Sequence, residues 1–221
     1  MKKTIVLSLG GSLIVPREIN TDFLKKFVSF VKKTSRRNKI IIVCGGGHTC
    51  RYYITKANKI AKLSEIKKDN IGIAAIKLNA TLIHSLLPDS KLIFLEKRSK
   101  IRFNKILITG FLKHGKTSDA DAVLLAHIYK TKEVINLTNV DFVYNKDPRK
   151  YKTAKPIKKL LWKDYLKIIP SFKAGIHTPF GPVASNLARK YKIKVVILKG
   201  TDIPNLENYL ANKKFRGTII K

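Results

Sequence analysis

Three glycine-rich stretches in this chain have the composition of phosphate-binding loops. They cover residues 9–12 (L-G-G-S), 44–48 (C-G-G-G-H) and 110–118 (G-F-L-K-H-G-K-T-S). Glycine lets backbone N–H groups approach an anion without a Cβ atom in the way, and a following helix adds its positive end. One such stretch indicates only a tight turn, whereas three of them predict that more than one phosphate group is bound.

The third stretch also matches the P-loop pattern G-x-x-x-x-G-K-[ST], from Gly110 to Thr117. In a P-loop NTPase, Thr117 would hold Mg²⁺, and Asp141 could serve as the second carboxylate of such a site. A P-loop usually follows the first strand of its domain, whereas this match lies in the middle of the chain. We therefore interpret it as a phosphate-binding loop of another design.

The elements that must position these loops alternate along the chain. Short β-branched runs predict strands over residues 4–9, 39–43, 92–95, 106–109, 134–137, 195–198 and 218–220. Helical patterns cover residues 21–33 (capped by Asn20), 48–61, 71–87, 118–130, 160–168, 183–191 and 204–211. This order predicts an α/β fold, a three-layer α-β-α sandwich with a mostly parallel central sheet. Ligands of such sheets bind beyond the carboxyl ends of the strands, where all three glycine stretches fall.

The charge of the chain is extreme for its 221 residues. It has 46 Lys and Arg against 14 Asp and Glu, a formal net charge of +32. A polyanionic partner is one interpretation, and lysines that merely cover a solvated surface are the other. We favour the second, because the lysines are spread along the whole chain and form no basic tail. Nucleic acid is then expected to bind only non-specifically, through charge, while small phosphorylated ligands are attracted in either case.

The cysteines and the N-terminus predict a cytoplasmic protein. Cys44 and Cys50 fit no zinc pattern, so we interpret them as two ordinary buried thiols in a reducing compartment. The first 18 residues resemble a signal peptide but lack a small-x-small cleavage site, and Gly-Gly-Ser interrupts their apolar run. The chain has no run of about 18 uncharged apolar residues, so we expect no membrane span.

A fourth stretch, N-L-T-N-V-D-F-V-Y-N-K-D-P from residue 136, resembles the nucleotide-binding signature T-x-V-D-G-V-Y-x-x-D-P of the amino acid kinase superfamily. The first glycine stretch resembles its phosphate loop, and V-C-G-G-G-H-T-C-R resembles the G-G-G…R turn of its UMP (uridylate) kinases. The run H-G-K-T-S-D-A-D-A resembles the G-x-T-T-D-A-x-A loop of archaeal-type UMP kinases. The similarity extends over essentially the whole chain.

This resemblance implies an activity and a division of the domain. The activity is transfer of the γ-phosphoryl group of ATP to UMP with Mg²⁺, which gives UDP for pyrimidine nucleotide synthesis, by an enzyme assembled as dimers or hexamers. Within a single domain, residues 1–130 would form the acceptor-binding half and residues 131–221 the ATP-binding half. The alternatives are a kinase of another small phosphate, such as isopentenyl phosphate, for which His48 is an argument, and a catalytically weak nucleotide- or RNA-binding regulator.

The resemblance also implies roles for individual residues. The positions on the ATP side are Gly10, Gly11, Ser12, Gly47, Arg51, Thr138, Asn139, Asp141, Tyr144 and Asp147. The positions on the UMP side are Gly46, Asp69, Gly115, Lys116, Thr117 and Ser118. Asp69 would bind the acceptor ribose, although an isolated Asp before a helix can equally be an N-cap.

Two residues are expected to be catalytic. By resemblance, Asp119 orders the catalytic cations, and it can also stabilise the start of the following helix. Lys116 would place a positive charge beside the phosphates, with Lys113 as the alternative for that role. We assign no set of protein side chains as dedicated metal ligands.

Two departures from the family pattern bear on activity. Phe142 stands where the signature usually has Gly, which could alter the turn or narrow the nucleotide pocket. Gly181 stands where relatives often have the Asp of a D-P pair, near the reacting phosphates. Either another acid compensates for Gly181 or catalysis is impaired. His177, just upstream, is expected to be a surface or loop residue, because phosphate acceptors need no strong base.

Overall fold

The computed structural model describes residues 2–96, 99–111, 115, 117–148, 150–169 and 178–221, and its core is one eight-stranded sheet. The strand order is β3-β4-β2-β1-β5-β9-β10-β8. The parallel strands are β1 (Thr4–Leu9), β2 (Lys39–Cys44), β3 (Ser90–Leu95), β4 (Ile106–Phe111), β5 (Glu133–Thr138) and β9 (Lys194–Lys199). β10 (Thr218–Ile220) runs antiparallel to β9 and parallel to β8 (Lys159–Leu160). A separate hairpin pairs β6 (Val143–Tyr144) with β7 (Pro156–Ile157).

The central strands are apolar on both faces. In β1 and β2 all residues but the first are buried, and their register pairs Ile5 with Ile40 and Leu7 with Ile42. Continuous Val, Ile and Leu runs of this kind belong to parallel strands that helices cover on both sides. The predicted α/β fold with a mostly parallel sheet is therefore confirmed.

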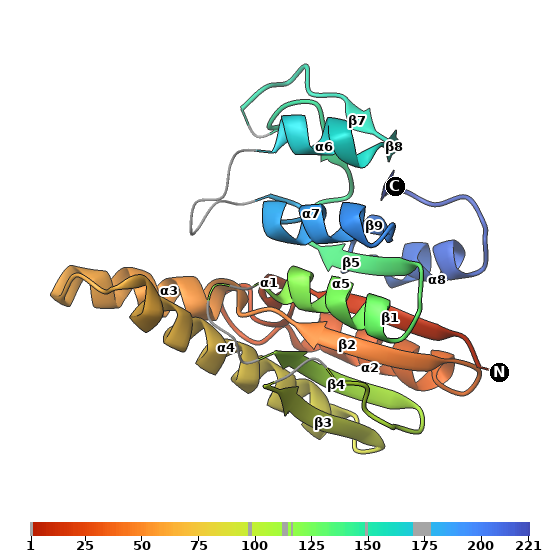
Figure 1. Ribbon diagram of the computed structural model, residues 1–221, viewed down its shortest axis with the longest axis horizontal. Coiled ribbons are helices and arrows are strands. Elements are labelled where there is room, and N and C mark those ends of the chain that lie inside the picture. Colours follow the sequence, from red (N-terminus) through yellow and green to blue (C-terminus); the bar gives the residue numbers. More distant parts are fainter. Residues whose placement is uncertain (1, 97–98, 112–114, 116, 149, 170–177) are drawn as a thin grey trace.

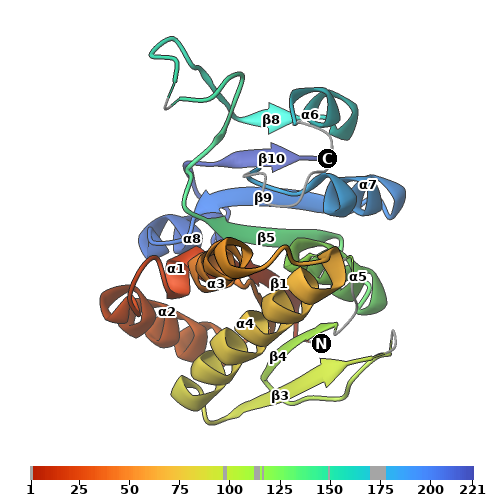
Figure 2. The same ribbon diagram turned by 90° about the vertical axis from the view of Figure 1, so that its left-hand side faces the viewer.

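Helices cover the two faces as separate layers (Figures 1 and 2). One face carries α5 (Ser118–Ile128), α6 (Trp162–Ile168) and α7 (Pro182–Lys190), which share one apolar core with the sheet. The other face carries α1 (Gly11–Ile14), α2 (Thr21–Thr34), α4 (Glu65–Leu86) and α8 (Ile203–Leu210), with a second core. α3 (Gly47–Ile60) lies against α4 and projects beyond the sheet in Figure 1.

The ends of the predicted helices lie within two residues of those in the structure, except for the start of α4. Asn20 caps α2 as predicted, because its side chain accepts a hydrogen bond from the N–H of Phe23 over 3.1 Å. α4 begins at Glu65 rather than at residue 71, and the side chain of Ser64 caps it. The interpretation of Asp69 as an N-cap is therefore wrong, since Asp69 lies in the second turn of this helix. No helix among the described residues is long and apolar enough to cross a membrane.

Candidate active site

The first two glycine stretches lie in direct backbone contact at the carboxyl ends of β1 and β2. A Cβ atom added to Gly11 would lie 2.2 Å from the carbonyl oxygen of Gly45 and 2.6 Å from the nitrogen of Gly47. Gly47 has φ +59°, and a Cβ atom there would lie 2.2 Å from the carbonyl carbon of Gly11. Only glycine fits at both positions, so the sequence fixes a close meeting of two loops that both precede a helix.

The start of α5 faces this pair of loops. The hydroxyl of Ser118 would lie 3.3 Å from a Cβ atom on Gly45, and Thr117 caps the helix by accepting a hydrogen bond from the N–H of Ala120. The starts of α1, α3 and α5 thus gather at one edge of the sheet. Helix starts carry free N–H groups and a partial positive charge, so this edge suits phosphate groups.

Two side chains support the loops from outside. Arg51 in α3 donates a hydrogen bond from Nη2 to the hydroxyl of Ser12 over 2.8 Å. Asn79 in α4, which is 1% exposed, donates from Nδ2 to the carbonyl oxygen of Gly45 over 2.8 Å. The guanidinium of Arg51 therefore lies at the first loop, where it can neutralise a bound phosphate. Asn79 satisfies a carbonyl that would otherwise be buried without a partner.

Asp119 points inward from the first turn of α5. Its Oδ1 accepts a hydrogen bond from the hydroxyl of Ser8 on β1 over 2.8 Å, and Ser8 is 2% exposed. The residue as a whole is half-buried, but its carboxylate is held at this inner position. Burial raises the pKa of Asp119, and hydrogen bonds from Ser8 and from the backbone of Gly181 oppose the increase.

Gly181, at the start of α7, therefore lies directly beside the predicted catalytic acid. The side-chain amide of Asn136 on β5 donates a hydrogen bond to the carbonyl oxygen of Pro179 over 2.6 Å, which ties this segment to the sheet. Gly181 has φ −68° and ψ 152°, and a Cβ atom there would meet no atom of the described residues within 4 Å. The described part of the chain thus leaves room for a side chain at the position where the family pattern predicts an Asp.

The predicted acceptor positions lie on α4 and in the third glycine stretch. The Oδ2 atom of Asp69 accepts a hydrogen bond from the N–H of Gly115 over 2.6 Å, and Gly115 has φ +71°. Gly46 lies between this helix and α3, since a Cβ atom on it would lie 3.4 Å from the carbonyl oxygen of Gly72. Three of the predicted acceptor positions are therefore near neighbours in space.

The predicted donor side follows the end of β5. The N–H of Gly10 donates to the carbonyl oxygen of Leu137 over 2.9 Å, which joins the first glycine loop to this strand. Asp141 accepts hydrogen bonds from the hydroxyl of Tyr144 over 3.0 Å and from Arg216 over 3.2 Å. Burial raises the pKa of Tyr144, and the neighbouring Asp141 raises it further.

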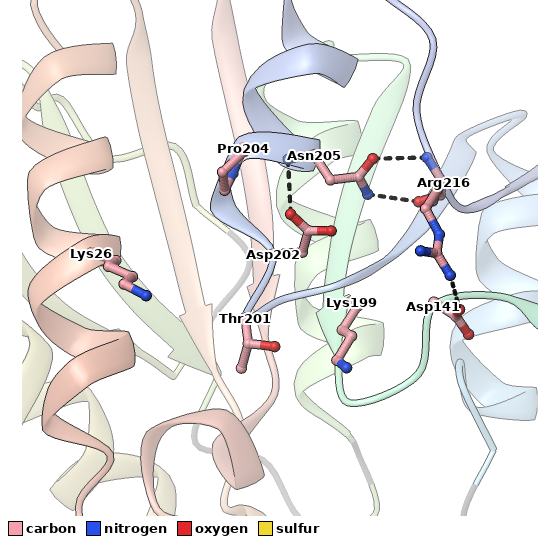
Figure 3. A pocket seen from close by; sticks show the side chains of 8 residues that line it. All are labelled: Lys26, Asp141, Lys199, Thr201, Asp202, Pro204, Asn205 and Arg216. Carbon is pink, nitrogen blue, oxygen red and sulfur yellow. Dashed lines mark hydrogen bonds and ion pairs between the residues drawn. The ribbon is translucent and has the colours of Figure 1, made fainter.

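Asp141 also lines a pocket of about 440 Å³ (Figure 3). Lys199 at the end of β9 and Lys26 of α2 line the same space, and Arg216 pairs with Asp141 on one side of it. This pocket brings three cations to the donor side. Asp202 lines the pocket as well, so three cations stand against two acids, and the small positive excess favours an anionic group.

Taken together, the geometry gathers one centre that suits phosphate groups, flanked by the two predicted substrate sides. Two glycine loops, helix starts and Arg51 form the centre; Asp69 and Gly115 lie on one side, and the end of β5 lies on the other. Phosphoryl transfer requires two phosphorylated molecules with their phosphates facing each other, and this arrangement is compatible with that requirement.

Comparison with known proteins identifies the family. The amino acid kinase family matches residues 3–96 and 100–199. The chain belongs to this family. The predicted resemblance is thus confirmed, and the alternative of a P-loop NTPase is excluded.

Individual members of the amino acid kinase family are similar over the full chain. A uridylate kinase from Methanococcus aeolicus is 36% identical over 98% of both chains, and one from Methanospirillum hungatei is 33% identical over 98% of this chain and 94% of its own. The crystal structure of uridylate kinase from Archaeoglobus fulgidus superposes with a TM-score of 0.81 at 30% identity, covering 100% of both chains.

The predicted site residues can now be located. Most of them lie at the carboxyl edge of the parallel strands or on the helices that begin there: Gly10, Gly11, Ser12, Gly46, Gly47, Arg51, Thr117, Ser118 and Asp119. Asp69 lies on α4 and is joined by a hydrogen bond to Gly115 in the third glycine stretch. Thr138, Asn139, Asp141, Tyr144 and Asp147 follow β5. Lys116, Lys113 and His177 lie outside the described residues. The individual roles of all these residues stay predictions.

Some details of the site depart from the sequence prediction, and others were missed. Cys44 is buried, which raises the pKa of its thiol to about 12, but Cys50 is only half-buried. The ring of Phe142 contacts that of Tyr144 edge-on, with centroids 6.3 Å apart. Ser8 and Asn79 were not predicted as part of the site, because a polar residue inside a strand or helix carries no motif.

Proposed function

We propose that this enzyme transfers the γ-phosphoryl group of ATP to UMP, giving ADP and UDP. The observation that carries the proposal is the backbone contact between the glycine loops of β1 and β2, with an acceptor side and a donor side around it. The names of the relatives, uridylate kinases at 33–36% identity over nearly the whole chain, support UMP as the acceptor.

In this reaction the bond between Pγ and the β,γ-bridging oxygen breaks, and a phosphate oxygen of UMP forms the new bond to Pγ. The acceptor oxygen is already ionised, so no strong base is needed, and rate depends on alignment and charge neutralisation. The N–H groups of Gly11, Ser12 and Gly47 would bind donor phosphates, and Arg51 would neutralise them. Asp69 and residues 115–118 would hold UMP.

The residues present fit Mg²⁺ in a limited way. Mg²⁺ is usually held by one or two carboxylates together with substrate phosphates, and Asp119 offers one carboxylate beside the glycine loops. Among the described residues no cluster of three or more His, Cys, Asp or Glu side chains could hold a metal by itself. When bound with ATP, Mg²⁺ would neutralise charge on the transferring phosphoryl group. Asp119, oriented by Ser8 and Gly181, would fix its position.

We also infer that the enzyme works as a homo-oligomer in the cytoplasm. α3 has no buried residue, and the two helices α3 and α4 expose large apolar side chains: Tyr52, Tyr53, Ile60, Ile66, Leu78 and Leu86. A second copy of this chain, pairing its own α3 and α4 there, would cover this surface. The free thiols Cys44 and Cys50 and the nucleotide substrates support a cytoplasmic location.

The test is ADP release from Mg-ATP with UMP, CMP, AMP, GMP and isopentenyl phosphate as separate acceptors. We expect turnover with UMP at least tenfold above the others. Turnover with isopentenyl phosphate instead would keep the fold and change the substrate, with His48, whose ring stacks on Tyr52, as the first residue to examine. ATP binding without turnover on any acceptor would favour a regulator and contradict the proposal.

A further inference from the structure

A second pocket lies at the opposite end of the sheet from the glycine loops. Its volume is about 890 Å³, and its walls are the N-terminal ends of β1, β2 and β5 with the segment that precedes β4. This is the edge at which Figure 1 marks the N-terminus. β1 has six residues, so the two ends of the sheet are about 16 Å apart at 3.3 Å per residue. We call it the basal pocket.

The basal pocket is lined mainly by cations. Seven lining side chains are Lys or Arg, and one is an acid. Lys2 and Lys3 precede β1, and Lys39 opens β2. The other four cations form two pairs along the chain. Lys100 and Arg102 precede β4, and Lys130 and Lys132 follow α5.

These two pairs, like Lys2 and Lys3, are exposed cations of the pocket. Lys100 and Arg102 are exposed in the segment before β4, and Lys130 and Lys132 are exposed between α5 and β5. Four separate segments of the chain thus bring positive charge to one concave surface. Charges that converge on a concavity produce a stronger local potential than the same charges spread over a flat face.

The single acid of the basal pocket is already neutralised from outside it. Glu133 forms an ion pair with Lys194 and accepts a hydrogen bond from the hydroxyl of Tyr209 over 2.6 Å, and neither partner lines the pocket. Among the described residues, no acidic side chain forms an ion pair with any of the seven cations. The positive charge of the pocket is therefore balanced by no carboxylate of the described chain.

The walls of the basal pocket are held in place by hydrogen bonds and a ring contact. The hydroxyl of Tyr129 accepts from the N–H of Ile101 over 2.9 Å and donates to the carbonyl oxygen of the same residue over 2.6 Å. The ammonium of Lys39 donates to the carbonyl oxygen of Phe103 over 2.8 Å, and the rings of Phe103 and Tyr129 meet edge-on. The segment before β4 is thus fixed to α5 and β2, so little ordering is needed when a ligand binds.

We propose that the basal pocket is a second binding site, for a small ligand with at least two phosphate groups. The volume lies within the range of about 300–1,000 Å³ that is typical of small-molecule sites. The seven cations that line the pocket form no ion pair with a described acid, and they carry more positive charge than one phosphate group neutralises. Nucleic acid fits less well, because the two aromatic rings here pack on each other instead of standing free to stack on bases. The site is separate from both substrate positions.

The test uses inorganic tripolyphosphate, titrated calorimetrically into the full-length protein saturated with UMP in buffer without Mg²⁺. Two double variants remove pocket charge: Lys100→Gln with Arg102→Gln, and Lys130→Gln with Lys132→Gln. The matched control is Lys25→Gln with Lys32→Gln on the exposed face of α2, which lowers the net charge equally. We expect each pocket variant to weaken tripolyphosphate binding at least about tenfold, and the control less than twofold, with kcat for UMP unchanged in all three.

The contrary outcomes are distinct. Equal weakening in the control would reduce the effect to net charge and overturn a built site. Binding that none of the variants changes would assign tripolyphosphate to the ATP position and overturn the proposal too. Tight binding of a single-stranded RNA 15-mer, lost in the pocket variants while tripolyphosphate does not bind, would replace the proposed small ligand by nucleic acid.

Discussion

The carboxylate of Asp69 in α4 accepts a hydrogen bond from the N–H of Gly115 over 2.6 Å, across 46 positions of sequence. Both residues were predicted to bind the acceptor, from two separate motifs. We expect Asp69→Asn to raise KM for UMP about tenfold, or about 1.4 kcal/mol, because hydrogen bonds to charged groups are the stronger ones. KM for ATP should change less than twofold, measured by steady-state kinetics with each substrate varied.

Asp89→Asn is the matched control, because Asp89 is exposed in the turn after α4. It removes the same charge at the opposite end of α4, without touching Gly115. A similar rise of KM for UMP in both variants would mean that the effect comes from overall charge. A rise of KM for ATP in Asp69→Asn would contradict the acceptor assignment.

Asn79 is predicted to support the second glycine loop. Asn79→Ala leaves the buried carbonyl oxygen of Gly45 without its hydrogen bond, which costs about 1–3 kcal/mol. In a domain of this size, a loss of about 2 kcal/mol lowers Tm by roughly 4–8 °C. Asn70→Ala, on an exposed position of the same helix, should lower Tm by less than 2 °C. Thermal unfolding with and without UMP checks both values, and equal losses would refute the supporting role.

We expect Asp119 to be required for activity. We also expect its ionised carboxylate to lower the stability of the folded protein, because the group is buried. Its pKa is raised because burial disfavours the ionised carboxylate more than Ser8 and Gly181 stabilise it. A raised pKa in the folded state means that stability is greatest below the ordinary value near 3.8 and decreases as pH rises through the raised value. Asp119→Asn should therefore lower kcat by about 10²–10³ but keep or raise Tm at pH 7.5.

The comparison to make is Tm of the wild type and of Asp119→Asn between pH 4 and pH 8. The advantage of the variant should shrink as pH falls, because the wild-type carboxyl becomes protonated. Binding of Mg-ATP, measured by calorimetry, should weaken in the variant while UMP binding does not. A large drop of Tm at pH 7.5 would show that the ionised carboxylate stabilises the fold, contrary to this account.

Much of this architecture could be predicted from the sequence, because the sheet is buried on both sides. Continuous apolar runs define β1 and β2 to within one residue, and glycine stretches at their ends must meet where parallel strands end. The start of α4 was missed because residues 65–70 are mostly polar and carry no helical apolar period. There the cap of Ser64 and the ion pair between Glu65 and Lys68 extend the helix instead.

The side chains that support the site were less predictable. Ser8 lies inside an apolar strand, and only the placement of α5 across the sheet makes it the partner of Asp119. The contact between Gly181 and Asp119 depends on a segment that Asn136 anchors through the carbonyl oxygen of Pro179. Contacts of this kind join positions far apart in the chain and have no local pattern.

Gly181→Asp should raise activity. A Cβ atom at this position meets no atom of the described residues within 4 Å, and φ −68° with ψ 152° suits any residue, so the backbone can accept the change. The new side chain extends beside Asp119, where a second carboxylate can help to hold Mg²⁺ with the phosphates. We expect kcat to rise at least about tenfold, or about 1.4 kcal/mol, and the Mg²⁺ concentration for half-maximal rate to fall.

The charge added by Gly181→Asp should also change the pH dependence of the rate. This second effect distinguishes an added carboxylate from an added side chain of the same size. A like charge raises the pKa of a neighbouring carboxyl, so the acid limb of the pH–rate profile of Gly181→Asp should move to higher pH than in the wild type. Gly181→Asn has nearly the same size without the charge and should change neither kcat nor the acid limb. If Gly181→Asn raises kcat as much as Gly181→Asp, the gain comes from filling the space. If neither variant raises kcat while the pH limb still moves, the wild-type enzyme already has all the carboxylates that its reaction needs.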